Sequence, residues 1–166
     1  MERQVPRMDE LESAAWTRLV AVLQLLPAAL DAQLQRDAEL THFEFALLSI
    51  LRFAPESTLR MKQLAQATHA TPPRLSHVVS RLEKRGLVIR TPGGSDRRAT
   101  NASLTDDGRR ALIRATPAHL ETVRRLVLAP LDRAQLAELA AIAEAIGRAV
   151  DPEGSFGAAL GGEITA

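Results

Sequence analysis

Residues 71–86, TPPRLSHVVSRLEKRG, decide the fold predicted for this chain. Thr71 is a good N-cap residue, and Pro72 and Pro73 suit a first helical turn, where their missing amides would have had no partner. Gly86 supplies a C-terminal stop. At 100° per residue the apolar side chains fall within one arc of about 100°, which predicts an amphipathic helix with one buried stripe. The stripe consists of Leu75, Val78, Val79 and Leu82.

The opposite face of this helix has short polar groups near its start and cations near its end. Such a face, with no large apolar residue, can approach the base edges in the major groove of DNA. Pro73 could offer only apolar contact, for example to a thymine methyl group. For His77 the alternative is a surface histidine without a role. The candidate hydrogen-bond donors to bases are Ser76, His77, Ser80 and Arg81.

Positive charge is concentrated around the same helix. Residues 60–98 contain nine Lys/Arg against two acids, a net charge of +7, whereas the whole chain carries +1. An isolated basic cluster is more often a solvated helix face, but a basic block inside a near-neutral chain is also the footprint of a polyanion-binding surface. The cations expected to contact phosphates, which add affinity but little sequence choice, are Arg60, Lys62, Arg74 and Lys84.

A β-hairpin is predicted after the helix. Residues 87–91 are β-prone, residues 92–96 form a turn, and residues 99–104 return as a second strand. This arrangement places Arg97 and Arg98 at the hairpin tip, and a guanidinium there suits a narrow, electronegative minor groove. The hairpin therefore favours the DNA interpretation of the basic block over the solvated face.

Helices are predicted on both sides of this region. A capping box at Thr41 and Glu44 opens a helix that ends near Ala54. A very short strand around Leu59 precedes a brief helix over 61–67, and its tight connection to the helix at 72 suggests a helix-turn-helix. An N-terminal helix over 11–36 is expected to be kinked at Pro27 rather than split in two. Two further helices, with a kink at Pro117, are expected within 105–150, and each of these outer helices has an apolar stripe.

Composition bounds the class of protein. A chain of 166 residues with 46% hydrophobic and 3% aromatic residues suits a single, mainly α domain, with flexible ends at 1–10 and 151–166. Without cysteine, disulfides and thiolate chemistry are excluded. No apolar run approaches the roughly 18 residues of a membrane span, so a cytoplasmic protein without membrane contact is expected. We expect no enzyme and no cofactor, because no nucleophile elbow, phosphate loop or His-Glu metal motif is present.

Two motifs resemble the MarR family of bacterial winged helix-turn-helix transcriptional regulators. Residues 81–90, RLEKRGLVIR, are similar to the family pattern R-L-x-x-x-G-L-V-x-R, and Asp96-Arg97-Arg98 followed by 104–108, LTDDG, is similar to D-x-R leading into L-T-x-x-G. The resemblance implies a winged helix-turn-helix at 40–104, flanked by dimerisation helices at 11–36 and 105–150. It also implies that Arg98 enters the minor groove and that Asp96 orients the wing, while Arg97 stands at a variable position.

The resemblance further implies a homodimer that presents two recognition helices to a near-palindrome in double-stranded DNA, and a small-molecule effector that binds where the dimer helices meet the winged helix. Ordinary core and dimer packing is the favoured alternative for the aromatic candidates, and a satisfied buried histidine is an equal alternative for His119. No close ligand spacing supports a metal site at His42, Glu44 and His119. The candidate effector contacts are Trp16, Phe43, Phe45 and His119.

The sequence therefore predicts a ligand-responsive, sequence-specific repressor. The alternative is a dimeric small-molecule-binding or protein-interaction module whose winged helix does not bind DNA. The salt dependence of duplex binding distinguishes the two functions, because only contacts to phosphates release counterions.

Overall fold

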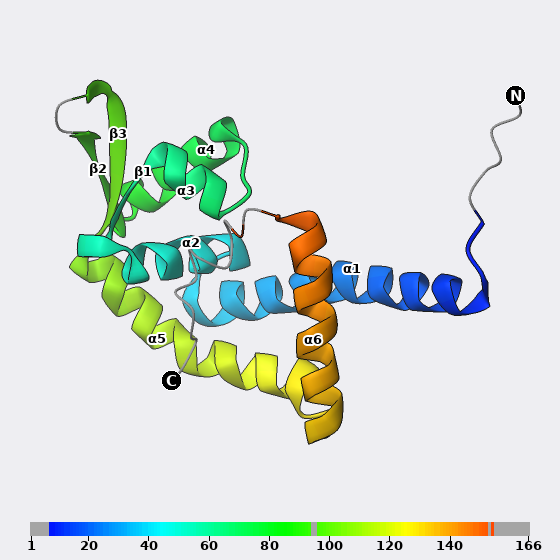
Figure 1. Ribbon diagram of the computed structural model, residues 1–166. Helices are drawn as coiled ribbons and strands as arrows, with labels where there is room; N and C mark the ends of the chain where they lie inside the picture. The colour runs from blue at the N-terminus through cyan, green and yellow to red at the C-terminus, as the bar shows by residue number, and fades with distance from the viewer. Residues whose placement is uncertain (1–6, 94–95, 153, 155–166) are drawn as a thin grey trace, which may run out of the picture.

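The predicted class, mainly α with a small β wing, is confirmed. The computed structural model describes residues 7–93, 96–152 and 154, and of residues 96–98 the backbone only. The elements in chain order are α1 (Glu10–Ala38), α2 (His42–Phe53), the 3-10 turn η1 (Pro55–Ser57), β1 (Thr58–Arg60), α3 (Met61–Ala67), α4 (Pro72–Lys84), β2 (Val88–Gly93), β3 (Asp96–Leu104), α5 (Asp106–Val123), the π-helical η2 (Arg124–Leu128) and α6 (Arg133–Val150). In Figure 1 the sheet, α3 and α4 form one end of the molecule, and α1 runs away from them.

Local capping chemistry sets the helix limits near α4. The capping box of α2 is present as predicted, with the Glu44 amide donating to the Thr41 hydroxyl at 3.1 Å and the Thr41 amide donating to the Glu44 carboxylate at 2.8 Å. After α4, Gly86 adopts a φ of +70°, which glycine tolerates best. Thr71 occupies the N-cap position of α4, but its hydroxyl makes no capping hydrogen bond. Pro72 and Pro73 have no amide hydrogen to donate to it, and the Arg74 amide does not donate to it either.

The wing is a three-stranded antiparallel sheet in the order β1-β3-β2. The short strand expected around Leu59 is β1, and the hydroxyl of Thr58 donates to that of Ser103 at 2.8 Å across the β1–β3 pair. Both hairpin strands run further than predicted. Pro92 and Gly93 belong to β2, where the missing proline amide is tolerated because β2 is an edge strand. Only residues 94–95 remain between the strands, and they lie outside the described residues.

The hydrophobic core lies among α2, α3, α4 and the sheet. The predicted stripe of α4 is confirmed, because all four of its members are buried. They pack in one cluster with Leu47 and Leu51 of α2, Leu64 of α3 and Leu112 of α5, and Leu34 brings the end of α1 into it. The core thus fixes one face of α4 and leaves the other to solvent.

Helix α1 is continuous through Pro27, so the possibility of two separate helices is excluded. Of its predicted stripe only Leu30 and Leu34 are buried, and the N-terminal part is exposed, with Trp16 52% and Leu23 59% accessible. The sequence interpretation assigned this helix to dimerisation, and no described element of the chain covers the first half of its stripe.

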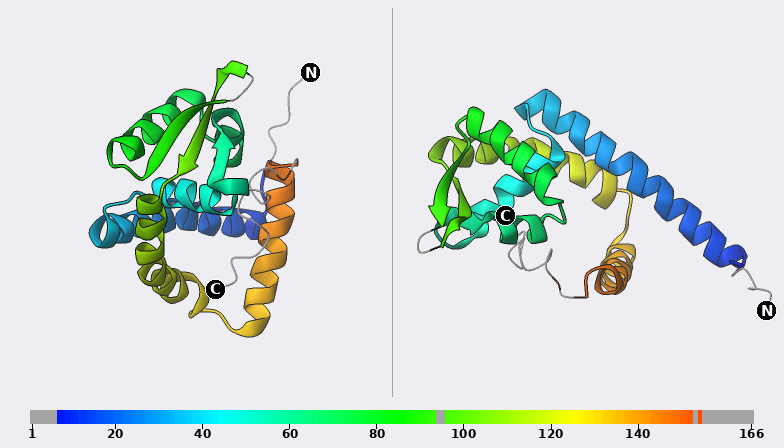
Figure 2. Two further views of the ribbon diagram at one scale, coloured as in Figure 1. Left: turned by 90° about the vertical axis from the view of Figure 1, so that its left-hand side faces the viewer. Right: turned by 90° about the horizontal axis from the view of Figure 1, so that it is seen from above.

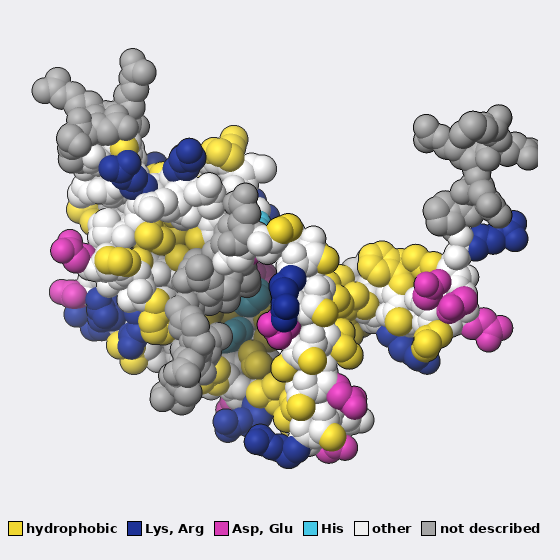
Figure 3. All heavy atoms as spheres, in the orientation of Figure 1, with side chains coloured by type: hydrophobic (Ala, Val, Ile, Leu, Met, Phe, Trp, Pro, Cys, Tyr) yellow, Lys and Arg dark blue, Asp and Glu magenta, His cyan; other side chains and the backbone are white. Residues whose placement is uncertain are grey.

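Helix α6 stands apart from the rest of the chain (Figure 2). None of its residues is buried, although Leu139, Ile146 and Val150 lie on its predicted apolar stripe. Its C-cap residue Asp151 lies 3.6 Å from His69, in the turn between α3 and α4. Figure 3 shows apolar side chains gathered on α6 and on the outer part of α1. Two helices thus present apolar faces that no other described part of the chain covers.

The expectation about apolar runs needs one correction. Helix α1 is long and apolar enough to cross a membrane by length and composition alone. The sequence interpretation sought an uninterrupted apolar run, whereas α1 combines many Ala, Val and Leu residues with a few scattered polar ones. A core helix of a soluble protein and an N-terminal signal sequence pass the same test, so one such helix is weak evidence for a membrane span.

The base of the wing is fastened to the start of α5. The Thr105 hydroxyl donates to the Gly86 carbonyl at 2.7 Å and accepts from the Gly108 amide at 3.0 Å. Gly108 lies so close to the chain entering β2 that a Cβ atom there would be 2.1 Å from the Leu87 carbonyl oxygen. Glycine at 108 therefore allows α5 and the wing base to meet.

Candidate nucleic-acid interface

Helix α4 presents the polar face that its sequence predicted. Pro73, Ser76 and His77 are exposed on it, and Lys84 is exposed at its end. The helix is held from behind by its buried stripe, so these side chains have a fixed backbone beneath them. Three of the five predicted base-contacting residues thus lie together on one accessible face, and the other two, Ser80 and Arg81, are bound to neighbouring side chains.

Arg81 is held by a carboxylate from α2. Its Nε atom donates to Glu44 Oε1 at 2.8 Å, and the Glu44 side chain is only 1% exposed. The Arg81 side chain remains 45% exposed. Arg85 approaches the same oxygen at 4.0 Å and also donates to the Glu39 carbonyl at 2.8 Å, at the end of α1. The end of α4 is thereby attached to the junction of α1 and α2.

Ser80 takes part in a second link, between α4 and the wing. Arg90 of β2 donates through Nε and Nη2 to one carboxylate oxygen of Glu83, at 2.9 and 2.7 Å, and its amide donates to the other at 3.1 Å. The same Nη2 donates to the Ser80 hydroxyl at 3.0 Å. These hydrogen bonds from the Arg90 side chain and then its amide lower the pKa of Glu83. The network joins the recognition helix to strand β2 of the wing.

Arg74 covers an aromatic ring from α2. Its guanidinium carbon lies 4.6 Å from the centre of the Phe43 ring, a cation–π distance. Beside this pair is an open hollow of about 440 Å³ between α4, the end of α1 and the start of α2. The hollow is lined by Asp31, Thr41, Phe43, Arg74, His77, Val78 and Arg81. It combines two cations of the recognition helix with an aromatic wall from α2.

The remaining DNA candidates lie on both sides of α4. Arg60, at the end of β1, and Lys62, in the first turn of α3, are exposed, as a phosphate contact requires. Asp96, Arg97 and Arg98 begin β3, so the wing carries them as predicted. Their side chains lie outside the described residues.

Two histidines and a phenylalanine meet where α2 packs on α5. The His119 ring centre lies 4.5 Å from that of Phe45 and 5.7 Å from that of His42. His119 Nδ1 is 3.2 Å from Gln33 Oε1 of α1, and the side chain is buried. Within this chain His119 is therefore a buried histidine with a hydrogen-bond partner, which was one of the two alternatives considered for it. Burial lowers the pKa of His119, with a smaller effect of His42 in the same direction, and burial lowers the pKa of His42 against the opposing charge of Asp31.

The four predicted effector contacts do not form one pocket within a single chain. Phe45 and His119 touch each other, and Phe43 lines the hollow beside α4. Trp16 stands seventeen residues before Gln33 on α1, roughly 25 Å away along a helix that rises 1.5 Å per residue. Among the described residues no group of three potential ligands is arranged for a metal ion, and Glu44, considered earlier with His42 and His119, binds Arg81 instead.

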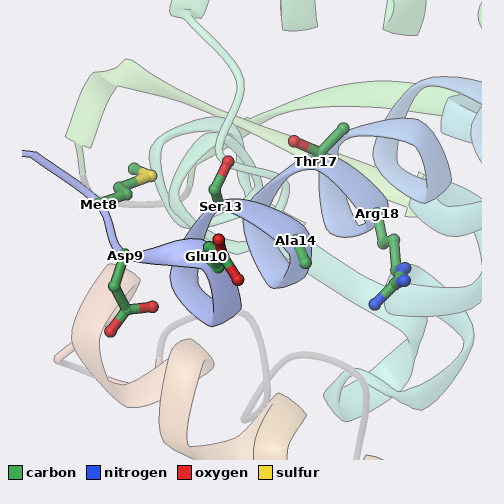
Figure 4. A pocket seen from close by; sticks show the side chains of 7 residues that line it. All are labelled: Met8, Asp9, Glu10, Ser13, Ala14, Thr17 and Arg18. Atoms are coloured by element: carbon green, nitrogen blue, oxygen red, sulfur yellow. The ribbon is translucent and has the colours of Figure 1, made fainter.

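A second hollow lies at the start of α1, away from α4. It measures about 580 Å³ and is lined by Met8, Asp9, Glu10, Ser13, Ala14, Thr17 and Arg18. Figure 4 shows that these side chains all come from the first turns of one helix and the residues just before it. None of the predicted site residues lies there.

Comparisons with known proteins agree with this geometry. The MarR family model matches residues 39–99, which include α2, α3, α4 and most of the wing. The structure of Sco3205, a MarR family transcriptional regulator from Streptomyces coelicolor solved in complex with DNA, superposes with a TM-score of 0.84 at 36% identity, over 89% of this chain and 92% of that one. The chain belongs to the MarR family.

Two further similarities support the assignment to the MarR family. AbsC, a MarR family transcriptional regulator from Streptomyces coelicolor, matches with a TM-score of 0.83 at 31% identity, over 89% of this chain and 99% of that one. The uncharacterized HTH-type transcriptional regulator YdcH of Bacillus subtilis is 33% identical over 81 residues, which span 48% of this chain and 55% of that protein. MarR family proteins are DNA-binding transcription regulators and not enzymes.

In this MarR family chain the sequence interpretation missed the partners of the recognition helix. Glu44 was considered as a helix cap and as a metal ligand, and Arg90 as part of a motif and of the basic block. Their side-chain partners Arg81 and Ser80 were missed because they lie 37 and 10 residues away in sequence. Gln33 was not noticed at all, although a glutamine among the apolar residues of α1 was a signal for a buried hydrogen bond.

Proposed function

We propose that this MarR family regulator is a cytoplasmic, ligand-responsive repressor that binds a near-palindromic operator as a homodimer. The observation that carries the proposal is the outer face of α4, which exposes Ser76 and His77 above a fully packed stripe. The likeness to Sco3205, solved in complex with DNA, supports the same use of the winged helix. In this proposal Pro73, Ser76, His77, Ser80 and Arg81 face the major groove.

The remaining cations supply affinity. Arg60, Lys62, Arg74 and Lys84 contact phosphates, and the wing brings Arg97 and Arg98 to the minor groove with Asp96 orienting it. Contacts to phosphate position the protein but carry little sequence information. Among the cations of α4, only Arg81 is proposed to read bases rather than contact phosphates. Glu44 binds one side of its guanidinium, and the side chain remains 45% exposed to solvent.

The dimer is proposed from the uncovered apolar faces. Exposed apolar side chains on the outer half of α1 and along α6 have no partner element among the described residues of this chain. Contiguous apolar surface of this kind marks an association site in a soluble protein. A second copy that covers both faces would place two α4 helices on one side, for half-sites roughly 10 base pairs apart.

The effector is proposed to bind near the junction of the frame helices and the winged helix. The hollow beside α4 offers the Phe43 ring and the cations Arg74 and Arg81, which suit a small anionic aromatic compound. Phe45 and His119 lie on the neighbouring junction of α2 and α5. A compound that binds the DNA-incompetent arrangement more tightly releases the operator by population shift.

Selection of bound duplexes from a random library tests the function, followed by titration of the best sequence at several salt concentrations. A dimer that neutralises about eight phosphates should give a slope of log affinity against log salt near −7. A recovered inverted repeat supports the dimeric operator. A flat slope, or no enrichment of any sequence, supports the alternative of a module that does not bind DNA.

A further inference from the structure

The carboxylate of Glu44 does more than cap α2. Its Oε2 atom accepts from the Thr41 amide at 2.8 Å and from the Thr41 hydroxyl at 3.1 Å, and its Oε1 atom accepts from Arg81 Nε. The capping boxes of α1 and α6 use Glu12 and Gln135 in the same way, but both residues are exposed and neither side chain receives a cation. Burial of a capping carboxylate against an arginine of α4 is therefore specific to α2.

The contact leaves the outer edge of Arg81 available. Glu44 engages Nε, and no described residue accepts a hydrogen bond from the two terminal nitrogens of Arg81. Those nitrogens form the edge of the guanidinium that pairs in bidentate fashion with guanine O6 and N7 in the major groove. An arginine already held at Nε loses less conformational freedom when this edge binds, so its discrimination between bases is sharper.

The pair is also anchored from behind. Glu44 is 1% exposed, so water does not compete for its oxygens, whereas Arg81 is 45% exposed on the other side. Arg85, one turn further along α4, donates to the Glu39 carbonyl and fixes the same end of the helix to the end of α1. The direction of the Arg81 side chain is thus set by α2 rather than by its own rotamer preference.

We propose that Glu44 is a specificity-determining positioning residue that acts through Arg81. Glu44 touches no DNA; it aims the terminal edge of Arg81 at one base pair in each half-site. The inference rests on the proposed function, in which Arg81 faces the major groove.

A double-mutant cycle on the full-length protein tests the proposal, with Glu44→Gln, Arg81→Gln and the double variant. The dissociation constant is measured for the selected operator and for a scrambled duplex of equal length at one salt concentration. Glu44→Gln should reduce the ratio of the two constants about tenfold, a coupling of about 1.4 kcal/mol, with little change for the scrambled duplex. When Arg81→Gln is already present, adding Glu44→Gln should not change the ratio of the two dissociation constants any further.

Two further variants separate positioning from stability. Glu12→Gln makes the same exchange in the exposed capping box of α1 and should leave the ratio unchanged. Arg81→Lys leaves Glu44 and the α2 cap intact, but a lysine bound to Glu44 has no planar pair of donors left for a bidentate contact with a base. It should therefore reduce the ratio as Glu44→Gln does. The Arg81 Nε–H resonance of the free protein should be slow to exchange with solvent and should become fast in Glu44→Gln.

Additive effects in the cycle, or equal weakening for both duplexes with a lowered melting temperature, would overturn the proposal and leave Glu44 as a structural residue. A wild-type protein with the same affinity for operator and scrambled duplex would overturn the proposed function itself, before any variant is measured.

Discussion

The imidazole rings of His42 and His119 lie 5.7 Å apart between α2 and α5, and both histidines have pKa values lowered by burial. The native state therefore favours neutral rings, and acid must place charge in a half-buried site. Because the unfolded chain binds these protons from the ordinary value of 6.5 downward while the native state binds them only at lower pH, stability decreases as the pH falls below that value.

This relationship predicts that the free energy of unfolding drops between pH 7.5 and pH 5, measured by urea denaturation at a constant protein concentration. His119→Gln should show a smaller drop, because it removes one of the two groups. His77→Gln, on the exposed face of α4, is the matched control. An unchanged drop in His119→Gln would mean that other groups cause the pH dependence.

Gly108 should not tolerate a side chain. Gly108→Ala would bring a Cβ atom to 2.1 Å from the Leu87 carbonyl oxygen, so the start of α5 must move away from the wing base. We expect a loss of about 1–3 kcal/mol of folding free energy, the usual cost of overpacking. Gly147→Ala in α6, where a Cβ meets nothing within 4 Å, should instead raise stability by about 0.5–1 kcal/mol. Equal effects of the two substitutions would contradict the close approach at Gly108.

Arg90 should control the titration of Glu83. Arg90→Met removes the side-chain hydrogen bonds that lower the pKa of this carboxyl, so the pKa should rise toward its ordinary value of 4.5. Carbon-detected NMR titration of the side-chain carboxyl measures the change. Ser80→Ala keeps the Arg90–Glu83 pair and should leave the pKa low. A pKa that stays low in Arg90→Met would show that another group binds Glu83.

The apolar face of α6 should be needed for association. Leu139→Asp combined with Ile146→Asp places two charges on this face, which is 40% and 43% exposed at these residues in the single chain. Loss of about 2 kcal/mol would raise the dimer dissociation constant roughly 30-fold, measured by sedimentation. Ala141→Asp, on the opposite side of α6, is the control. A double variant that remains as dimeric as the wild type would place the interface elsewhere.

Ser76 and Ser80 should differ in their effect on base preference, although both were predicted to face DNA. The Ser76 side chain is exposed, whereas the Ser80 hydroxyl accepts from Arg90 at 3.0 Å. Ser76→Ala should therefore change the preferred bases at one or two operator positions, by about 0.5–1.5 kcal/mol at each, and Ser80→Ala should change them less. Library selection with each variant measures this, and the reverse ranking would contradict the role of the Arg90 contact.

The sequence could predict what is encoded within a few residues. The Thr41–Glu44 box, the stop at Gly86 and the stripe of α4 depend on spacings of one helical turn, and all three are confirmed. Side-chain pairs across the fold have no such local pattern. The Arg81–Glu44 contact joins residues 37 apart and the Gln33–His119 contact residues 86 apart, so neither follows from periodicity. The apolar stripe of α1 likewise does not reveal whether its own chain covers it, and only Leu30 and Leu34 of that stripe are buried.

Because α5 is attached to the wing base, a tilt of this helix changes the position of the wing relative to the far end of the helix. One end is fixed by Thr105 and Gly108 to the chain between α4 and β2, and the other continues through η2 toward α6. Its 18 residues span roughly 27 Å at 1.5 Å per residue, so a tilt of about 10° displaces one end by roughly 5 Å relative to the other. That displacement exceeds the roughly 3.4 Å rise of one base-pair step. In the proposed dimer, a tilt of this size in α5 would be large enough to put a wing out of register with its groove.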